Sequence, residues 1–487
     1  MTRGERGTAL PGESATSASS RGAGRSCAGS ESRGVTAATR LRGMVVVLRA
    51  LPGQQRLSYR APEKVERLRD ERIRRVVRYA AECVPHYREL FRRERIDPRD
   101  IRSAADLEAL PVLEKATVQR DPERFRAENR LGAEALVFRT AGSTGVPVTL
   151  YRDRRSVLEN VAHCERERAV ETALCGRRYG YSAAVIVPLT GNYTTVRTFY
   201  GRASFRPFRP SHHWLSIADG PAVHAEALAR IRPLVLRGYG SALELLFRTA
   251  ATRGWRLHRP AVVSYGGDAM TADARRLIED EFAIPVVSRY SSAEAFRLGF
   301  TCEERQGFHL YEDLTHVSVV DPDGGWLPEG ERGEIVVTDL VNHGMVLLNY
   351  RLGDVGRLGG RGCACGRTAR LLTELEGRVE SVMTLGDGTT VHPRLLEHVI
   401  HRRREVLRFR LEQLEPDRFE LLLVTADEEG YARIMPELVQ DLRARLGGAV
   451  VTVERRDELR ATEAGKFRPL VALDRSADRA AAAQSAP

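Results

Sequence analysis

The sequence predicts an α/β fold: a large layered N-terminal domain with parallel-rich sheets and helices, followed by a small, mobile α+β domain at the C-terminus. The chain has 487 residues, which is too long for one ordinary domain. Through its middle, short β-branched segments alternate with helical ones, and this alternation favours parallel strand pairing. Its last part changes to paired strands around one helix, which is typical of a separate α+β unit.

Composition predicts the limits of the domains. Residues 1–43 are rich in Gly, Ser, Ala, Thr and Arg and contain no aromatic residue, and residues 475–487 are rich in alanine. Neither stretch can bury a core, so both are predicted to be disordered tails. Between them the sequence predicts a core domain over residues 44–378 and a mobile domain over residues 379–474.

The expected elements follow in chain order. Apolar residues recur at helical spacing over residues 61–95, and a shorter helix is expected over residues 107–115, broken at Pro111. Three buried strands and three helices alternate in the middle of the chain: strands at residues 183–189, 261–267 and 284–292, and helices at 221–232, 241–253 and 271–282. A hairpin-rich segment covers residues 316–340. The small domain is expected to contain strands at 408–414, 418–425 and 450–455 and a helix at 430–446.

Composition also narrows the class of protein. A hydrophobic fraction of 42% and a charged fraction of 29% describe a soluble globular protein. No apolar run approaches the roughly 20 residues of a membrane span, and seven cysteines without an export signal favour thiols or metal ligands over disulfides. The expected location is the cytoplasm. The net charge of +11 comes with no nucleic-acid-binding module, so anionic small molecules are the expected ligands and nucleic acid is not.

One lysine near the C-terminus is a candidate catalytic group, and chance is the alternative. The chain has 76 basic residues, of which only Lys64, Lys115 and Lys466 are lysines. Lys466 lies in a glycine-containing segment, ATEAGKFRP, over residues 461–469. Arginine would serve equally well for surface charge, but a compact ammonium on a thin stem can enter a site that a planar guanidinium cannot.

Two motifs have residues suited to phosphate and magnesium. In FRTAGSTGVPVTLY (138–151), the glycines leave backbone N–H groups free to bind phosphate oxygens, although an ordinary hairpin turn has the same composition. In SRYSSAEA (288–295), Glu294 follows a predicted strand, where ligand crevices of such sheets lie. Its carboxylate suits Mg²⁺ that also binds phosphate oxygens, and a simple surface glutamate is the alternative.

Two further motifs have residues suited to a ribose. In NYRLGDVGRL (349–358), the Asp354 carboxylate can accept hydrogen bonds from two vicinal hydroxyls, or it can stabilise its own turn. In EGRVESV (376–382), Arg378 can reach ribose or phosphate, and Glu380 lies where a hinge between the domains is expected. Solvated charges on a linker are the alternative for this second motif.

The order of these motifs along the chain carries a resemblance. TAGSTG, GGD, YSSAE, YRLGD, GRVE and EAGK follow one another as in the adenylate-forming superfamily of acyl-CoA synthetases and nonribosomal adenylation domains. VPHYREL (84–90) and IRSAADLEALPVLEK (101–115) resemble the N-terminal region of its phenylacetate–CoA ligase-like branch. The resemblance covers residues 60–470. The chain departs from the common pattern with GVP in its phosphate loop, GGD for a glycine–glutamate pairing and Glu380 for the hinge aspartate.

The resemblance implies an acid–thiol ligase, AMP-forming, that works in two steps. A carboxylic acid, aryl or acyl, reacts with ATP and Mg²⁺ to give an acyl-adenylate and pyrophosphate, and coenzyme A then displaces AMP to give a thioester. The alternatives are transfer of the acyl group to an amine, or a catalytically inactive binding homologue. The small-molecule acid, ATP and coenzyme A are the expected partners, and a homodimer is a possible assembly.

The resemblance also implies roles for residues that match its motifs. The catalytic groups are Lys466, which would neutralise charge in the first step, and Glu294, which would bind Mg²⁺. The nucleotide-binding residues fall into three sets: Thr140, Ala141, Gly142, Ser143, Thr144 and Gly145 around the triphosphate; Gly266, Gly267, Asp268, Tyr290 and Ser291 around the adenine; and Asp354 and Arg378 at the ribose. Rotation of the small domain about Glu380 would withdraw Lys466 after adenylation.

Three cysteines and one histidine form a candidate structural zinc site. Cys302 and His309 lie in TCEERQGFHL, and Cys363 and Cys365 lie in GRGCACGRT. Three thiolates and one imidazole satisfy a closed tetrahedral Zn²⁺ site. Some members of the ligase branch have a similar set, and reduced thiols beside a surface histidine are the alternative.

The acid pocket is expected between the middle strands and their helices. Position along the chain places it near His212, His213, Trp214, Tyr239 and Ser264. Core packing or loop roles are the alternative for each of these residues.

Overall fold

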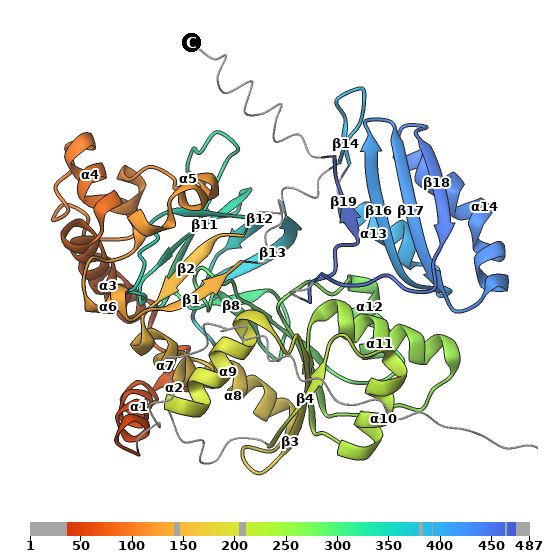
Figure 1. The fold of residues 1–487 in the computed structure, drawn as a ribbon, viewed down its shortest axis with the longest axis horizontal. Coiled ribbons are helices and arrows are strands. Elements are labelled where there is room, and N and C mark those ends of the chain that lie inside the picture. Colours follow the sequence, from red (N-terminus) through yellow and green to blue (C-terminus); the bar gives the residue numbers. More distant parts are fainter. Residues whose placement is uncertain are drawn as a thin grey trace, which may run out of the picture.

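The computed structural model describes residues 37–140, 147–203, 211–378, 383–391, 393–462 and 465–473. Figure 1 shows a large body of helices around a sheet and a smaller sheet with two helices at its side. The strands of the large sheet run in the order β10-β11-β12-β13-β9-β8-β7-β6-β5-β3-β4. The predicted α/β fold class is confirmed. No helix in the described ranges is long and apolar enough to cross a bilayer.

The first described element corrects the predicted N-terminal tail. Helix α1 (Ala37–Ala50) begins before residue 43 and packs against α7 (Arg154–His163) and α9 (Gly191–Ala203). Gly43 lies so close to α9 that a Cβ built on it would be 1.8 Å from the carbonyl oxygen of Ala203. The apolar run at 44–48 gives α1 a side to bury, and Gly43 allows the close approach. Apart from residues 37–43, which belong to α1, both predicted tails lie outside the described residues.

The predicted helix over residues 61–95 is two helices. They are α3 (Pro62–Cys83) and α4 (Pro85–Glu94), separated by the extended Val84. The break has a simple cause, because Pro85 lacks a backbone N–H and disfavours helical geometry in the residue before it. The other short helices of this region are α2 (Gln54–Leu57), the 3-10 helix η1 (Ala105–Ala109), α5 (Lys115–Arg120), the 3-10 helix η2 (Pro122–Phe125) and α6 (Arg130–Ala133). The helix predicted over residues 107–115 is therefore wrong beyond Ala109.

Five strands form the parallel half of the large sheet. They are β3 (Ser182–Val187), β4 (Ser211–Ser216), β5 (Val235–Gly238), β6 (Val262–Tyr265) and β7 (Val286–Tyr290). One face packs on α10 (Pro221–Ile231), α11 (Gly240–Arg253) and α12 (Ala272–Asp280), and the other on α8 (Glu165–Cys175). The three predicted strands and three predicted helices of this region are confirmed.

The sheet continues as an antiparallel half. Its strands are β8 (Gly299–Thr301), β9 (Phe308–Leu310), β10 (Thr315–Val320), β11 (Arg332–Asp339), β12 (Tyr350–Gly359) and β13 (Leu371–Arg378). The predicted hairpin is confirmed as the pairing of β10 with β11. A separate two-stranded hairpin, β1 (Leu136–Arg139) with β2 (Thr149–Arg152), lies over the large body (Figure 1).

The small domain has its own sheet and core. Its elements are β14 (Met383–Thr384), β15 (Thr390–Val391), α13 (Pro393–His401), β16 (Val406–Glu415), β17 (Arg418–Thr425), α14 (Glu428–Arg445), β18 (Val450–Arg455) and β19 (Leu470–Val471). Four of these strands form one sheet in the order β18-β17-β16-β19, and β14 pairs with β15 separately. Leu411, Phe419, Leu421 and Leu438 are fully buried between this sheet and its two helices. The predicted hinge residue, Glu380, lies outside the described residues, and both its role and the mobility of this domain stay predictions.

Charged groups connect the small domain to the large one. Nδ1 of His401 lies 2.7 Å from Oε1 of Glu244 on α11. Arg404 lies 2.6 Å from Glu281, and His398 lies 3.3 Å from Asp273. The interface therefore contains ion pairs and hydrogen bonds besides its apolar contacts.

Candidate active site

The loop that carries Lys466 lies against the C-terminal ends of two parallel strands. Gly465 has a φ of +75°, and a Cβ built on it would lie 2.3 Å from Cγ of Pro188 and 3.2 Å from Cγ2 of Ile217. Pro188 follows β3 directly, and Ile217 follows β4. The C-terminal ends of parallel strands are where ligand crevices of such sheets form. Lys466 therefore lies at this crevice, although it belongs to the small domain.

Asp268 links the Lys466 loop to the large domain. Its carboxylate accepts hydrogen bonds from the backbone N–H of Ser241 (3.1 Å), the Ser241 hydroxyl (2.5 Å) and the backbone N–H of Phe467 (3.4 Å). Burial raises the pKa of Asp268 to about 6, although these hydrogen bonds and Lys466 act in the opposite direction. Asp268 therefore connects the first turn of α11 to the Lys466 loop. Its predicted place beside the adenine stays a prediction.

Three predicted site carboxylates are near enough to act on the charge of Lys466. Burial lowers the pKa of Lys466, and the nearby Arg378 guanidinium lowers it further. The carboxylates of Asp354, Glu294 and Asp268 act against this and favour the charged ammonium. The structure thus brings together the residues that the ordered motifs predicted to share one site.

Asp354 and Arg378 face each other on neighbouring strands. They are register partners in the pairing of β12 with β13, and Nε of Arg378 lies 2.8 Å from Oδ1 of Asp354. Arg378 also donates to the carbonyl of Leu352 (3.0 Å), and the buried Tyr290 hydroxyl donates to Oδ2 of Asp354 (2.8 Å). Asp354 therefore binds residues on other strands and does more than stabilise its own turn, which was the alternative. Both carboxylate oxygens keep lone pairs that could accept ribose hydroxyls.

A buried arginine that the sequence analysis missed holds the Glu294 loop. Arg152 is 1% exposed and donates from Nη2 to the carbonyl of Glu294 (2.9 Å) and to Oδ2 of Asp339 (2.5 Å), which is 2% exposed. Its guanidinium carbon lies 3.7 Å from the ring centroid of Phe296. Arg152 ends the hairpin strand β2, so it connects the phosphate-loop hairpin to the Glu294 loop. Among so many arginines, nothing in the sequence distinguishes this one.

The predicted phosphate loop is only partly described. The backbone N–H of Val148 donates to the Thr140 hydroxyl (2.9 Å), and the backbone N–H of Thr140 donates to the carbonyl of Val148 (3.0 Å). Thr140 therefore closes the base of this loop. Five predicted triphosphate residues lie outside the described residues: Ala141, Gly142, Ser143, Thr144 and Gly145.

The remaining predicted adenine residues lie at the ends of β6 and β7. Gly267 has a φ of +89°, and a Cβ there would be 2.8 Å from the ring of Tyr239, so the ring lies directly against the glycine backbone. Gly266 precedes it, and Ser291 follows β7 with its side chain exposed. Their contact with a nucleotide stays a prediction.

The residues expected around the acid pocket divide between the two faces of the sheet. His212 and Trp214 alternate along β4, and their rings stack with centroids 5.2 Å apart. His213 lies opposite Ala184, which belongs to the core under α10, α11 and α12. Neighbouring residues of a strand point to opposite faces, so His213 is separated from His212 and Trp214. His213 therefore lies on the other face of the sheet, and the position of the acid pocket stays a prediction.

The predicted metal ligands form one cluster. Their ligand atoms all lie within 4.8 Å of one another. Sγ of Cys302 is 3.6 Å from Sγ of Cys363, and Sγ of Cys365 is 3.4 Å from Nε2 of His309. Tetrahedral zinc with ordinary bond lengths would separate two sulfurs by about 3.8 Å and a sulfur from a nitrogen by about 3.5 Å. The described donor set fits a Cys₃His zinc site.

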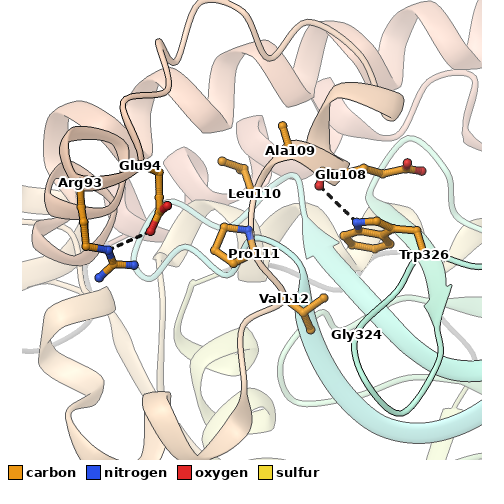
Figure 2. A pocket seen from close by; sticks show the side chains of 9 residues that line it. All are labelled: Arg93, Glu94, Glu108, Ala109, Leu110, Pro111, Val112, Gly324 and Trp326. Atoms are coloured by element: carbon orange, nitrogen blue, oxygen red, sulfur yellow. Dashed lines mark hydrogen bonds and ion pairs between the residues drawn. The ribbon is translucent and has the colours of Figure 1, made fainter. Parts of the chain in front are cut away.

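A surface pocket lies outside this region. It has a volume of about 320 Å³ and is lined by Arg93 and Glu94 on α4, by residues 108–112 and by a turn that includes Trp326 (Figure 2). Nε1 of Trp326 donates to the carbonyl of Glu108 (3.2 Å). None of the predicted site residues lines this pocket, so it has no part in the candidate active site.

The large sheet, the small domain and the Lys466 loop that contacts the large domain define a class of fold. It is the fold of the two-domain adenylate-forming ligases. A phenylacetate-coenzyme A ligase from Thermus thermophilus is 28% identical to this chain over 362 residues, which make up 69% of this chain and 75% of that protein. The phenylacetate-coenzyme A ligase of Escherichia coli is 24% identical over 362 residues, with coverages of 69% and 76%. No protein-family model matches the chain.

The solved structures agree with this fold. A crystal structure of 2-hydroxyisobutyryl-CoA ligase in the postadenylation state, in complex with R3-HIB-AMP, has a TM-score of 0.67 at 19% identity and covers 89% of this chain and 94% of that chain. The same ligase with 2-HIB-AMP and CoA in the thioesterification state has a TM-score of 0.55 at 19% identity and the same coverage. Together with the sequence relatives, these similarities confirm the predicted resemblance to the phenylacetate–CoA ligase-like branch of the adenylate-forming superfamily.

Proposed function

We propose that this protein is an AMP-forming acid–thiol ligase that activates a carboxylic acid with ATP and transfers the acyl group to coenzyme A. The observation that carries the proposal is the position of Lys466, which the small domain holds at the crevice beside Asp354, Arg378 and Glu294. An ammonium at this place can stabilise negative charge that develops on oxygen during nucleotidyl transfer. The sequence relatives named as phenylacetate-coenzyme A ligases support the same reaction type.

The proposed reaction has two steps, adenylation of the acid and transfer of the acyl group to coenzyme A. A carboxylate oxygen of the acid attacks the α-phosphorus of ATP, the bond to the β-phosphate bridging oxygen breaks, and pyrophosphate leaves. The thiolate sulfur of coenzyme A then attacks the acyl carbon, and AMP leaves with the bonding electrons. Glu294 would bind Mg²⁺, which supplies charge neutralisation at the phosphates. Asp354 and Arg378 would orient the ribose, and the hairpin closed by Thr140 would bind the triphosphate.

The direct test is a panel of aryl, fatty and amino acids in carboxylate-dependent ATP–pyrophosphate exchange, with hydroxylamine trapping of the activated acyl group. At least one acid should promote exchange and give a hydroxamate. AMP release with coenzyme A should exceed release with amines. Preference for an amine would establish the amide-forming alternative, and absence of exchange with every acid would favour an inactive binding homologue.

Changing Gly465 should impair the first step. In Gly465→Ala, the new Cβ overlaps Pro188 and the residue keeps an unfavourable positive φ, so the Lys466 loop cannot dock as it does here. We expect exchange to fall about tenfold or more, because left-handed backbone strain alone costs about 1–3 kcal/mol. Gly448→Ala is the matched control, since Gly448 has a φ of +85° but no atom within 4 Å of a new Cβ. Equal exchange in the two variants would contradict the docking role.

The first step should also lose activity below about pH 6. Burial raises the pKa of Asp268 to about 6, so its carboxyl is protonated below that pH and no longer attracts the Lys466 ammonium. The measurement is the pH profile of the exchange rate, which should show an acid limb near pH 6. Asp268→Asn should remove this limb, whereas Asp387→Asn, at an exposed turn of the small domain, should leave it in place.

We also propose that Cys302, His309, Cys363 and Cys365 hold one structural zinc ion. The site would join the β8–β9 hairpin to the segment after β12, next to the strand that carries Tyr290. Elemental analysis of the purified protein should find about one zinc per chain. Cys363→Ser should lower both the zinc content and the melting temperature, while Cys83→Ser should change neither. A zinc-free protein with unchanged melting temperature would refute the site.

The location and assembly of the protein remain predictions. The cytoplasm agrees with cysteines that carry no disulfide in the described part of the chain. A homodimer is the predicted assembly, and its measurement is the mass in solution.

A further inference from the structure

The sheet face covered by α8 changes from apolar to polar along its strands. Near the strand N-termini, Ala183, Val235 and Val262 pack on Val170 of α8. Nearer the C-terminal ends, the neighbouring β5 and β6 carry Arg237 opposite Ser264, and both residues lie two positions further along than the apolar row. The polar end of this face is the end beside the Lys466 crevice.

One of the two arginines on this polar end is fully paired. Arg237 forms a two-bond ion pair with Glu171 of α8, in which Nε and Oε1 are 2.9 Å apart and Nη2 also bonds to Oε2. Its Nη1 lies 2.8 Å from Nε2 of His212. Burial would raise the pKa of Glu171, but Arg237 and Arg289 outweigh burial and lower it. Both oxygens of the Glu171 carboxylate therefore bond to Arg237.

The other arginine, Arg289, has a buried donor without an acceptor. Its Nε is buried and has no hydrogen-bond partner in the described part of the chain, while the residue as a whole is half-buried. A Cβ built on Gly266 would lie 3.5 Å from Cβ of Arg289 and 3.8 Å from its Nε. The guanidinium stem thus passes over a glycine, and no side chain from that position covers it.

Aromatic rings line the same face. Trp214 of β4 lies opposite Val185, which in turn lies opposite Arg237. Its ring stacks on His212 and meets Tyr193 of α9 edge-on, with centroids 5.5 Å apart. The Gly465 loop touches Pro188, three residues beyond Val185, which is about 10 Å along a strand. An acid with its carboxylate at Lys466 and its tail along this face would reach both the rings and Arg289.

We propose that Arg289 determines specificity in the acid pocket, and that the preferred substrates are aromatic carboxylic acids bearing a second acceptor oxygen: a ring hydroxyl, carbonyl or carboxylate. This inference rests on the proposed ligase function. A buried guanidinium N–H without an acceptor is costly, and an acceptor oxygen on the substrate would satisfy it. An acid that lacks this oxygen leaves the donor unpaired, and a charged hydrogen bond of this kind discriminates by about 10- to 100-fold.

The test compares phenylacetate with 4-hydroxyphenylacetate, 3-hydroxyphenylacetate and 4-carboxyphenylacetate as acids in ATP–pyrophosphate exchange. The wild-type protein should show a kcat/KM about 10- to 100-fold higher for at least one oxygen-bearing acid. Arg289→Met should abolish that preference and keep the KM for ATP, while Arg289→Lys should retain part of the preference. Arg230→Met, at an exposed arginine of α10, is the control and should behave as wild type.

Other outcomes overturn the inference in distinguishable ways. Activation of phenylacetate with no preference for any oxygen-bearing acid would overturn the role of Arg289 and leave the ligase function standing. A preference that persists in Arg289→Met, or a rise in the KM for ATP alone, would assign Arg289 elsewhere. If Arg289→Met does not fold, the same comparison is made with Arg289→Gln. No exchange with any acid would overturn the inference and the proposed function together.

Discussion

Lys466→Ala is expected to lower carboxylate-dependent ATP–pyrophosphate exchange by about 100- to 1,000-fold, the usual effect of removing a group that stabilises transition-state charge. The structure places this ammonium beside Asp354, Glu294 and Asp268 and lowers its pKa through burial. Without it, the oxygens that gain negative charge during attack on the α-phosphate lose their nearest mobile cation. Lys466→Arg should also fail, because the planar guanidinium is wider than the ammonium that the loop delivers.

The same variant separates the two half-reactions. Supplied with a preformed acyl-adenylate and coenzyme A, Lys466→Ala should form thioester at nearly the wild-type rate, since no nucleotidyl transfer is then required. Lys64→Ala is the matched control, because Lys64 is an exposed lysine of α3 far along the chain from the site motifs. Exchange at the parent rate in Lys466→Ala would refute the catalytic role.

Arg152→Met is expected to destabilise the protein by about 3–5 kcal/mol, because it leaves Asp339 buried without its partner. The loss should appear as a lower midpoint in urea unfolding of the large domain. Arg152 also donates to the carbonyl of Glu294, so the variant should need a higher Mg²⁺ concentration for half-maximal exchange.

A control and a double variant make this second prediction specific. Arg155→Met changes an arginine only three residues away whose side chain is 76% exposed, and its stability should change by less than about 1 kcal/mol. The double variant of Arg152→Met with Asp339→Asn should recover part of the lost stability, because no buried carboxylate is left without a partner. Equal destabilisation by Arg152→Met and Arg155→Met would show that the buried ion pair contributes no more to stability than an exposed arginine does.

Sequence reasoning predicted the elements whose periodicity is strong. β3, β6 and β7 are buried on both faces, so they appear as short β-branched runs that need no tertiary information. The division at Pro85 was missed although its cause is local. Helix α1 was missed for a different reason: its burial depends on α7 and α9, which lie more than a hundred residues further along the chain.

Site residues that belong to a sequence motif could be predicted. Site residues whose role depends on packing in the folded protein could not. The order of motifs was enough to bring Asp354, Arg378 and Lys466 to one place. The motif order gave no indication of Arg152 or Arg289. The role of an arginine depends on its contacts in the folded protein, and this sequence has too many arginines for one to be recognised without them. Alternation along β4 could have separated His213 from His212 and Trp214, had the strand been recognised.

The polar contacts between the domains, such as His401 with Glu244 and the ion pair of Arg404 with Glu281, bear on how readily the two parts can separate. Polar groups that part from each other regain water, whereas apolar residues that also join the domains, among them Leu245 and Leu407, would be exposed to it. The predicted rotation of the small domain would break these polar contacts and form them again in each turnover. Rising ionic strength should accordingly shift the balance of its conformations toward the parted one.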